Sequence, residues 1–159
     1  MGKIGFIGLG IMGKPMAGHL LDAGHELFVS NKSGGASDLI SAGATGCDSY
    51  AEIAGKADTV ILMVPNTPEV EAVLFEEGGV AEGLGSGKLV IDMSSIAPIP
   101  TKEFAAKIQA QGSDYLDAPV SGGEVGAKAG TLTIMVGGSD AAFAQAKPLF
   151  EIMGQHITH

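Results

Sequence analysis

Short apolar stretches alternate along this sequence with longer segments in which apolar residues recur at helical spacing. The stretches that predict buried strands are residues 3–8, 26–30, 59–64, 88–92, 115–117 and 131–136. The segments that predict helices are residues 12–23, 37–42, 69–75, 101–111 and 140–153. Strand alternating with helix is typical of a parallel sheet with helices on both faces. The sequence therefore predicts an α/β fold of Rossmann type, with a doubly wound, mostly parallel sheet in three α/β/α layers.

Glycines and prolines stand where the predicted helices should end and begin. Gly24, Gly43 and Gly112 occupy positions typical of helix C-caps. Pro68 and Pro98 occupy positions typical of a first helical turn. No linker, repeat or change of composition interrupts the pattern, so residues 1–159 are predicted to form one domain.

Composition and charge exclude several classes of partner. Hydrophobic residues make up 45% of the chain and charged residues 17%, as suits strands buried on both faces. A net charge of −9 argues against a nucleic-acid partner. The longest apolar run, residues 4–12, is much shorter than the ~18 residues of a membrane span and lacks the cleavage site of a secretory signal. Cys47 is the single cysteine, which excludes an internal disulfide and predicts an inert core residue. We therefore expect a cytoplasmic protein that contacts no membrane.

The segment "GLGIMG" directly follows the first predicted strand and opens the first predicted helix. This placement is typical of the loop that binds the pyrophosphate of a dinucleotide. The first glycine permits the tight turn, the second lets the backbone approach the pyrophosphate, and the third lets helix and strand pack closely. A purely structural turn is the alternative interpretation. The predicted cofactor-binding residues of the loop are Gly8, Leu9, Gly10, Ile11, Met12 and Gly13.

The end of the second predicted strand bears on the choice of dinucleotide. Folds that prefer NAD carry an Asp or Glu there, which binds the ribose hydroxyls. This sequence has no carboxylate at that point but has Asn31 and Lys32. The Asn31 amide can bond a ribose hydroxyl and Lys32 can face a 2′-phosphate, although Lys32 is also interpretable as a solvated loop residue. The sequence favours NADP as the cofactor and leaves NAD open.

Several separated motifs resemble the β-hydroxyacid dehydrogenase family. They are "FIGLGIMG" followed by "MAGHL", then "MVP", "DMSS", "DAPVSGG" and "GTLTIMVGG", and together they extend over the whole chain. The resemblance implies hydride transfer between NAD(P)H and a small semialdehyde acid, which gives a hydroxy acid. The words "DMSSIAP" and "DAPVSGGEVGAKAGTL" are most similar to the branch that reduces tartronate semialdehyde to glycerate. The 3-hydroxyisobutyrate dehydrogenases share most of these words and remain an alternative.

The same resemblance implies roles for residues outside the glycine loop. It implies that Val64, Pro65 and Ser95 contact the cofactor, which suits their positions at the carboxyl ends of predicted strands. It further implies that the substrate carboxylate binds at Ser121, Gly122 and Gly123. A hydroxyl beside two unhindered amides makes a suitable anion site.

The family's catalytic lysine belongs to a long helix that follows its nucleotide domain. This sequence ends at His159 before such a segment, so we expect no catalytic residue within it. The family's helical second domain is expected to be absent, and a full-length protein is expected to be a homo-oligomer. Three residues are of types that serve as catalytic groups in other proteins, but Lys128 is interpreted as a loop cation, Asp92 as a turn-former and His19 as a packing or capping residue. No pair of histidines has metal-binding spacing, and no metal is predicted.

A regulatory module that senses NAD(P) is the competing functional class, because Rossmann folds serve both purposes. The predicted substrate motif at Ser121 favours the enzyme, since a sensor would not need it.

Overall fold

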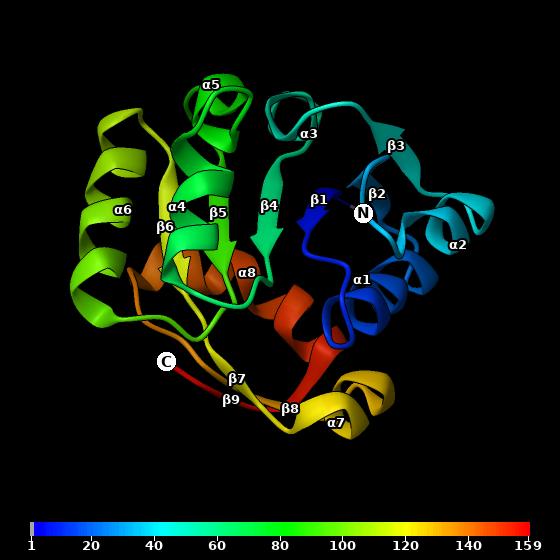
Figure 1. Ribbon diagram of the computed structural model, residues 1–159. Coiled ribbons are helices and arrows are strands. Elements are labelled where there is room, and N and C mark those ends of the chain that lie inside the picture. Colours follow the sequence, from blue (N-terminus) through cyan, green and yellow to red (C-terminus); the bar gives the residue numbers. More distant parts are fainter. Residues whose placement is uncertain (1) are drawn as a thin grey trace.

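Six parallel strands form the central sheet of the computed structural model, which describes residues 2–159 (Figure 1). They are β1 (Lys3–Ile7), β2 (Glu26–Ser30), β3 (Thr45–Cys47), β4 (Thr59–Leu62), β5 (Leu89–Asp92) and β6 (Asp114–Asp117). Their order across the sheet is β3-β2-β1-β4-β5-β6, with parallel pairing throughout. The chain thus winds outward in one direction from β1 and in the other from β4. This is the doubly wound Rossmann-type arrangement, and the predicted fold class is confirmed.

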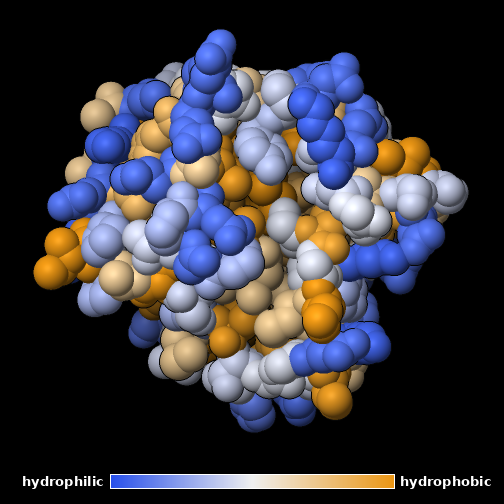
Figure 2. Space-filling model, viewed as in Figure 1, coloured by the Kyte–Doolittle hydropathy of each residue, from blue (hydrophilic) through white to orange (hydrophobic). Residues whose placement is uncertain are grey.

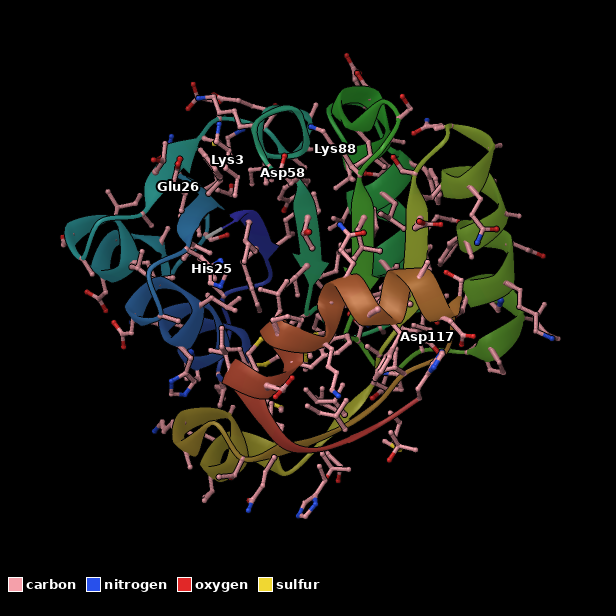
Figure 3. The ribbon with its side chains drawn as sticks, turned by 180° about the vertical axis from the view of Figure 1, so that it is seen from behind. Lys3, His25, Glu26, Asp58, Lys88 and Asp117 are labelled. Atoms are coloured by element: carbon pink, nitrogen blue, oxygen red, sulfur yellow. The ribbon has the colours of Figure 1, made fainter. Side chains whose placement is uncertain are left out.

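Helices cover both faces of this sheet. They are α1 (Gly13–Asp22), α2 (Ala36–Ser41), α3 (Tyr50–Lys56), α4 (Thr67–Phe75), α5 (Val80–Leu84), α6 (Pro98–Ala110), α7 (Gly123–Ala129) and α8 (Asp140–Met153). One core cluster joins the sheet to α1, α2, α7 and α8, and the other joins it to α3, α4, α5 and α6. In the view from behind, α8 crosses in front of the strands (Figure 3). No helix among residues 2–159 has the length and apolar character needed to cross a membrane.

Side-chain alternation along the strands explains how one sheet supports two cores. On β4, Ile61 faces the α1 side, while Val60 and Leu62 face the α4 side. Every residue of β4 is buried, as expected for a central strand with helices on both faces. The predicted glycine caps are also present, because Gly24, with a φ of 96°, follows the end of α1 in the backbone region that only glycine adopts easily.

The strand predicted at residues 131–136 forms, but it does not join the central sheet. Instead β8 (Leu132–Met135) lies in a second sheet of order β7-β8-β9, with β7 (Val120–Ser121) antiparallel to it and β9 (Gly154–Thr158) parallel to it. The chain leaves β6 at residues 118–119 and turns into β7, so β8 pairs with that short strand rather than with β6. Strands β3, β7 and β9 and helices α3, α5 and α7 were not predicted.

Charged residues lie at both ends of the central sheet, where its strands begin and where they stop. Figure 3 shows Lys3, Asp58 and Lys88 at one end of the sheet, where β1, β4 and β5 begin, and Asp117 toward the opposite end, where β6 stops. Lys88 Nζ donates to the carbonyl oxygen of Gly55 at 3.1 Å, near the end of α3. Lys88 thus has a structural role at the end of the sheet where the strands begin.

Candidate nucleotide-binding site

A pocket of about 800 Å³ opens at the carboxyl ends of β1 and β4, where the strand order changes direction. Its walls come from the loop between β1 and α1, from residues 63–65 after β4, from Ser95 after β5 and from α4. Figure 2 shows apolar residues near the centre of this face, with hydrophilic residues around them. Open α/β sheets bind their ligands in a crevice at this point of the topology.

The three motif glycines of the loop meet different surroundings. A Cβ at Gly8 would lie 2.1 Å from the carbonyl oxygen of Met63, and one at Gly13 would lie 1.7 Å from the carbonyl oxygen of Gly8. A Cβ at Gly10 would have no atom within 4 Å. Gly8 and Gly13 are therefore required by the packing of the loop itself. Gly10 instead leaves open space in the pocket wall, where the backbone can approach a ligand.

The amino end of α1 adds a site suited to an anion. The helix begins at Gly13, no side chain caps it, and its first turn carries no acidic residue. In the first turn of α1 the Lys14 and Met16 amides donate to the carbonyl oxygens of Gly10 and Met12, and Pro15 has no N–H, so among residues 2–159 only the Gly13 amide of this turn has no partner. Because α1 starts at the pocket wall, this amide and the positive end of the helix dipole favour a negatively charged group in the pocket.

Hydrogen bonds to two buried side chains set the shape of the wall after β4. The Val64 amide donates to Ser94 Oγ at 2.9 Å, and the Ser94 amide donates to Asp92 Oδ1 at 3.0 Å. Ser94 and Asp92 are fully buried. Asp92 therefore makes the Asx turn expected of a turn-former, and through Ser94 this turn fixes the wall segment that contains Val64.

Burial shifts the pKa values of the groups near the end of β5 and β6. It raises the pKa of the Asp92 carboxyl, although the Ser94 amide and the Tyr115 hydroxyl, which donates at 3.0 Å, act in the opposite direction. It also raises the pKa of the Tyr115 hydroxyl, with the adjacent Asp92 charge as the next cause. The pKa of Asp117 rises to about 6, because of burial and then repulsion from Asp92.

The end of β2 lies beside the pocket but does not line it. Ser33 lines the pocket, while Asn31 and Lys32 are exposed residues outside the lining. Asn31 Nδ2 donates to Asp48 Oδ1 at 2.9 Å, and the Lys32 amide donates to Ser30 Oγ at 3.2 Å. In the part of the chain that the structure describes, Lys32 forms no ion pair.

The remaining predicted residues divide between the pocket and the segment next to it. Ser121 ends β7 and is exposed, Gly122 precedes α7 with a φ of 133°, and Gly123 begins the helix with a φ of 60°. Val120 lines the pocket, so the segment of residues 121–123, here called the Ser121 loop, begins next to the pocket wall but does not line the pocket. Leu9 is buried and also lies outside the lining. The predicted residues that line the pocket are Gly8, Gly10, Ile11, Met12, Gly13, Val64, Pro65 and Ser95.

Comparison with known families gives the same result as the geometry of the loop. A family model described as the NAD binding domain of 6-phosphogluconate dehydrogenase matches residues 3–159. The chain belongs to this family of NAD-binding domains.

Relatives of this NAD-binding domain are dehydrogenases and reductases. The 2-hydroxy-3-oxopropionate reductase of Escherichia coli (strain K12) is 53% identical over 98% of this chain and 53% of its own length. A solved structure of Mycobacterium tuberculosis 3-hydroxyisobutyrate dehydrogenase with L-serine has a TM-score of 0.90 and 37% identity over 100% of this chain and 54% of that chain. A structure of Psf3 in complex with NADP+ and 2-OPP has a TM-score of 0.91 and 33% identity over 98% of this chain and 55% of that chain. The chain spans about half the length of the curated relatives it matches.

Other side chains that the sequence singled out have structural partners in this NAD-binding domain. His19 Nε2 lies 2.9 Å from the carbonyl oxygen of Ala127 and caps α7, as expected of a capping residue. Lys128 lies on α7 rather than in a loop, and it pairs with Glu124 at 2.8 Å. Cys47 is buried in the core, as predicted, and burial raises the pKa of its thiol. Among residues 2–159, no three His, Cys, Asp or Glu side chains are grouped closely enough to hold a metal.

The sequence did not predict the roles of two residues in the site region, Ser94 and Asp48. Ser94 stands inside the quoted word "DMSS", so its position was visible, but its hydrogen bond to the Val64 amide depends on how β4 and β5 pair. Asp48 follows the three-residue strand β3, which is too short to produce an alternating pattern.

Proposed function

We propose that this NAD-binding domain holds NAD(P)H for a reductase that converts a small semialdehyde acid to a hydroxy acid. The open space at Gly10, beside the uncapped amino end of α1, is the observation that carries the proposal. A side chain at this position would occupy room that a pyrophosphate needs. The 53% identity to a 2-hydroxy-3-oxopropionate reductase supports tartronate semialdehyde as the substrate and glycerate as the product. The match to a 3-hydroxyisobutyrate dehydrogenase supports that activity as the alternative.

The proposed cofactor runs along the pocket from the β2 end to the β5 end. The Gly13 amide and the dipole of α1 hold its pyrophosphate, and Val64, Pro65 and Ser95 contact it toward the nicotinamide. Leu9, Ile11 and Met12 complete the loop around the pyrophosphate. When bound, NAD(P)H supplies the hydride that reduces the aldehyde carbon.

We further propose a preference for NADP(H). The exposed Lys32 ammonium, which no carboxylate neutralises among the described residues, is available to a 2′-phosphate at the end of β2. Asn31 lies at the position from which folds of this class bind the adenine ribose. Replacing Asn31 with Asp should lower the affinity for NADPH relative to NADH.

The substrate carboxylate is proposed to bind at Ser121, Gly122 and Gly123. The positive φ values of both glycines turn their backbone into a conformation in which successive amides can point at one anion. The loop follows Val120 at the pocket wall, so a carboxylate held there keeps the aldehyde next to the cofactor. Such positioning contributes to the rate because it brings the reacting atoms together before reaction.

The proton for the new hydroxyl is proposed to come from outside this domain. Among residues 2–159, the pocket lining contains neither lysine nor histidine. The relatives are about twice as long as the chain, and we place the proton donor and a subunit interface of a homo-oligomer in that additional length. The single buried cysteine suits a cytoplasmic location.

Two measurements test the proposal. Titration of the chain with NADPH, followed by the cofactor's own fluorescence, should give saturable binding, and a chain that binds neither NADPH nor NADH would contradict it. In the full-length product of the gene, Ser121→Ala should raise KM for tartronate semialdehyde about tenfold, because one hydrogen bond to a carboxylate is lost. An unchanged KM would remove the Ser121 loop from the substrate site.

A further inference from the structure

A carboxylate lies at the carboxyl end of β2, although the acidic residue of β2 itself, Glu26, lies at the opposite end of the strand. Asp48 follows β3, the neighbouring strand, and its Oδ1 accepts a hydrogen bond from Asn31 Nδ2 at 2.9 Å. Asn31 occupies the position at which dinucleotide folds place the acid that binds the ribose. The acidic group is therefore present at this end of the sheet, but it comes from the adjacent strand.

The pairing of β2 with β3 fixes this contact. Ser30 is in register with Cys47, and the backbone amide of Asn31 continues the pairing of β2 with β3 by donating to the Cys47 carbonyl oxygen at 2.9 Å. A Cβ at Gly46 would lie 1.9 Å from Asn31 Oδ1, so the glycine provides the space in which the Asn31 side chain lies over β3. Backbone and side chain together hold Asn31 against Asp48.

No cation neutralises Asp48 within the described residues. Asp48 forms no ion pair there, and the group next to it is another carboxylate, because the Asp48 amide donates to Glu52 Oε2 at 3.4 Å. Glu52 itself has Lys56 at 3.9 Å. The nearby Lys14 is paired with Asp38, whereas Lys32 at the end of β2 forms no ion pair with any of residues 2–159.

We propose that Asp48 is a specificity-determining residue that opposes Lys32 and so allows the site to accept NADH as well as NADPH. This inference rests on the proposed binding of the dinucleotide in the pocket. A free 2′-hydroxyl can donate to the Asp48 oxygen that Asn31 does not use. A 2′-phosphate is attracted by the Lys32 ammonium and repelled by the Asp48 carboxylate. The preference for NADP(H) is therefore smaller than Lys32 alone would produce.

The substitution Asp48→Asn tests this role directly. It removes one negative charge but keeps a side-chain oxygen that accepts from Asn31. The ratio of the NADH Kd to the NADPH Kd should rise about five- to tenfold, as expected for loss of one repulsive charge near a phosphate in water and of one hydrogen bond to the ribose. Asp114→Asn is the matched control, because Asp114 is exposed at the start of β6, across the sheet, and its loss changes the net charge equally.

A second variant tests whether the position of the negative charge matters when the number of charges is kept the same. The double substitution Asn31→Asp with Asp48→Asn moves the carboxylate from β3 to the end of β2, keeps the amide–carboxylate contact and leaves the net charge unchanged. Its Kd ratio should return to that of the unmodified chain or favour NADH further.

Titration of the four proteins with NADH and NADPH, with thermal unfolding as a check on folding, gives distinguishable outcomes. A Kd ratio in Asp48→Asn within twofold of the unmodified chain overturns the role of Asp48. An equal change in Asp114→Asn also overturns it, because the effect would then come from net charge alone. If the unmodified chain binds neither cofactor, the proposed function fails first.

Discussion

Gly10 and Gly13 lie three residues apart in one loop, yet substitution should affect them in opposite ways. A Cβ at Gly13 would lie 1.7 Å from the Gly8 carbonyl oxygen and 3.3 Å from a ring carbon of Phe6. The added Cβ and the Gly8 carbonyl oxygen need a separation of ~3.2 Å. Gly13→Ala therefore forces the start of α1 away from β1 by roughly 1 Å or more. Overpacking of this kind costs ~3 kcal/mol, which corresponds to a fall in Tm of ~6–12 °C for a domain of this size.

Gly10→Ala should leave the fold intact, because no atom lies within 4 Å of the added methyl group. Its Tm should stay within ~2 °C of the unmodified chain, since surface changes usually remain within about 0.5 kcal/mol. Gly10→Val should also fold, but its branched side chain occupies the space proposed for the pyrophosphate, and NADPH affinity should fall at least ~100-fold.

Thermal unfolding by circular dichroism and NADPH titration of the three variants provide the assay. A fall in Tm in Gly10→Ala as large as that in Gly13→Ala would refute the distinction between the two glycines. Unchanged NADPH affinity in Gly10→Val would refute the assignment of the open space to the cofactor.

Three further predictions concern residues around the pocket. Ser94→Ala leaves the Val64 amide without its buried acceptor and should lower the free energy of unfolding by ~1–3 kcal/mol, as measured by urea denaturation. The pKa of Asp117 is raised to about 6, chiefly by burial, so the folded state binds its proton more tightly than the unfolded state. Its contribution to stability therefore falls as pH rises from about 4 to about 6, and Asp117→Asn should flatten this part of a Tm–pH curve and gain ~1 kcal/mol at pH 7 after allowance for solvent screening. Asn31→Asp places a second carboxylate beside Asp48 and should lower NADPH affinity about tenfold by repelling the 2′-phosphate. A fluorescence titration that finds no change would show that Asn31 does not lie beside the adenine ribose and its 2′-phosphate.

A separate prediction concerns the proposal that the proton donor lies outside this domain. The chain of residues 1–159 should bind NADPH but reduce tartronate semialdehyde at least ~100-fold more slowly than the full-length gene product, because a positioned general acid typically contributes ~10²–10⁴-fold. Spectrophotometric assay of NADPH oxidation measures both rates. Equal rates would place the proton donor within these residues, with Lys128 and His19 as the candidates.

Local patterns were sufficient to predict the glycine loop and five of the six strands of the central sheet, all except β3. Each buried strand has a run of apolar residues, and the loop glycines stand at fixed spacing between a strand and a helix. The short elements were not predictable in this way, because β3 has three residues and β7 has two, too few for a period to appear.

Contacts between strands were also beyond the reach of local patterns. The hydrogen bond from the Val64 amide to Ser94 joins residues 30 positions apart, and that from Asn31 to Asp48 joins residues 17 apart. Both depend on which strands are neighbours and in what register. The sequence showed no acid at the end of β2, whereas the pairing of β2 with β3 brings one there.

A crystal structure of the chain with NADPH tests the central claim most directly. The pyrophosphate should lie over Gly10 at the start of α1, with the 2′-phosphate near Lys32 and the nicotinamide toward Ser95. A dinucleotide bound elsewhere, or in the pocket with its pyrophosphate away from Gly10, would contradict the account.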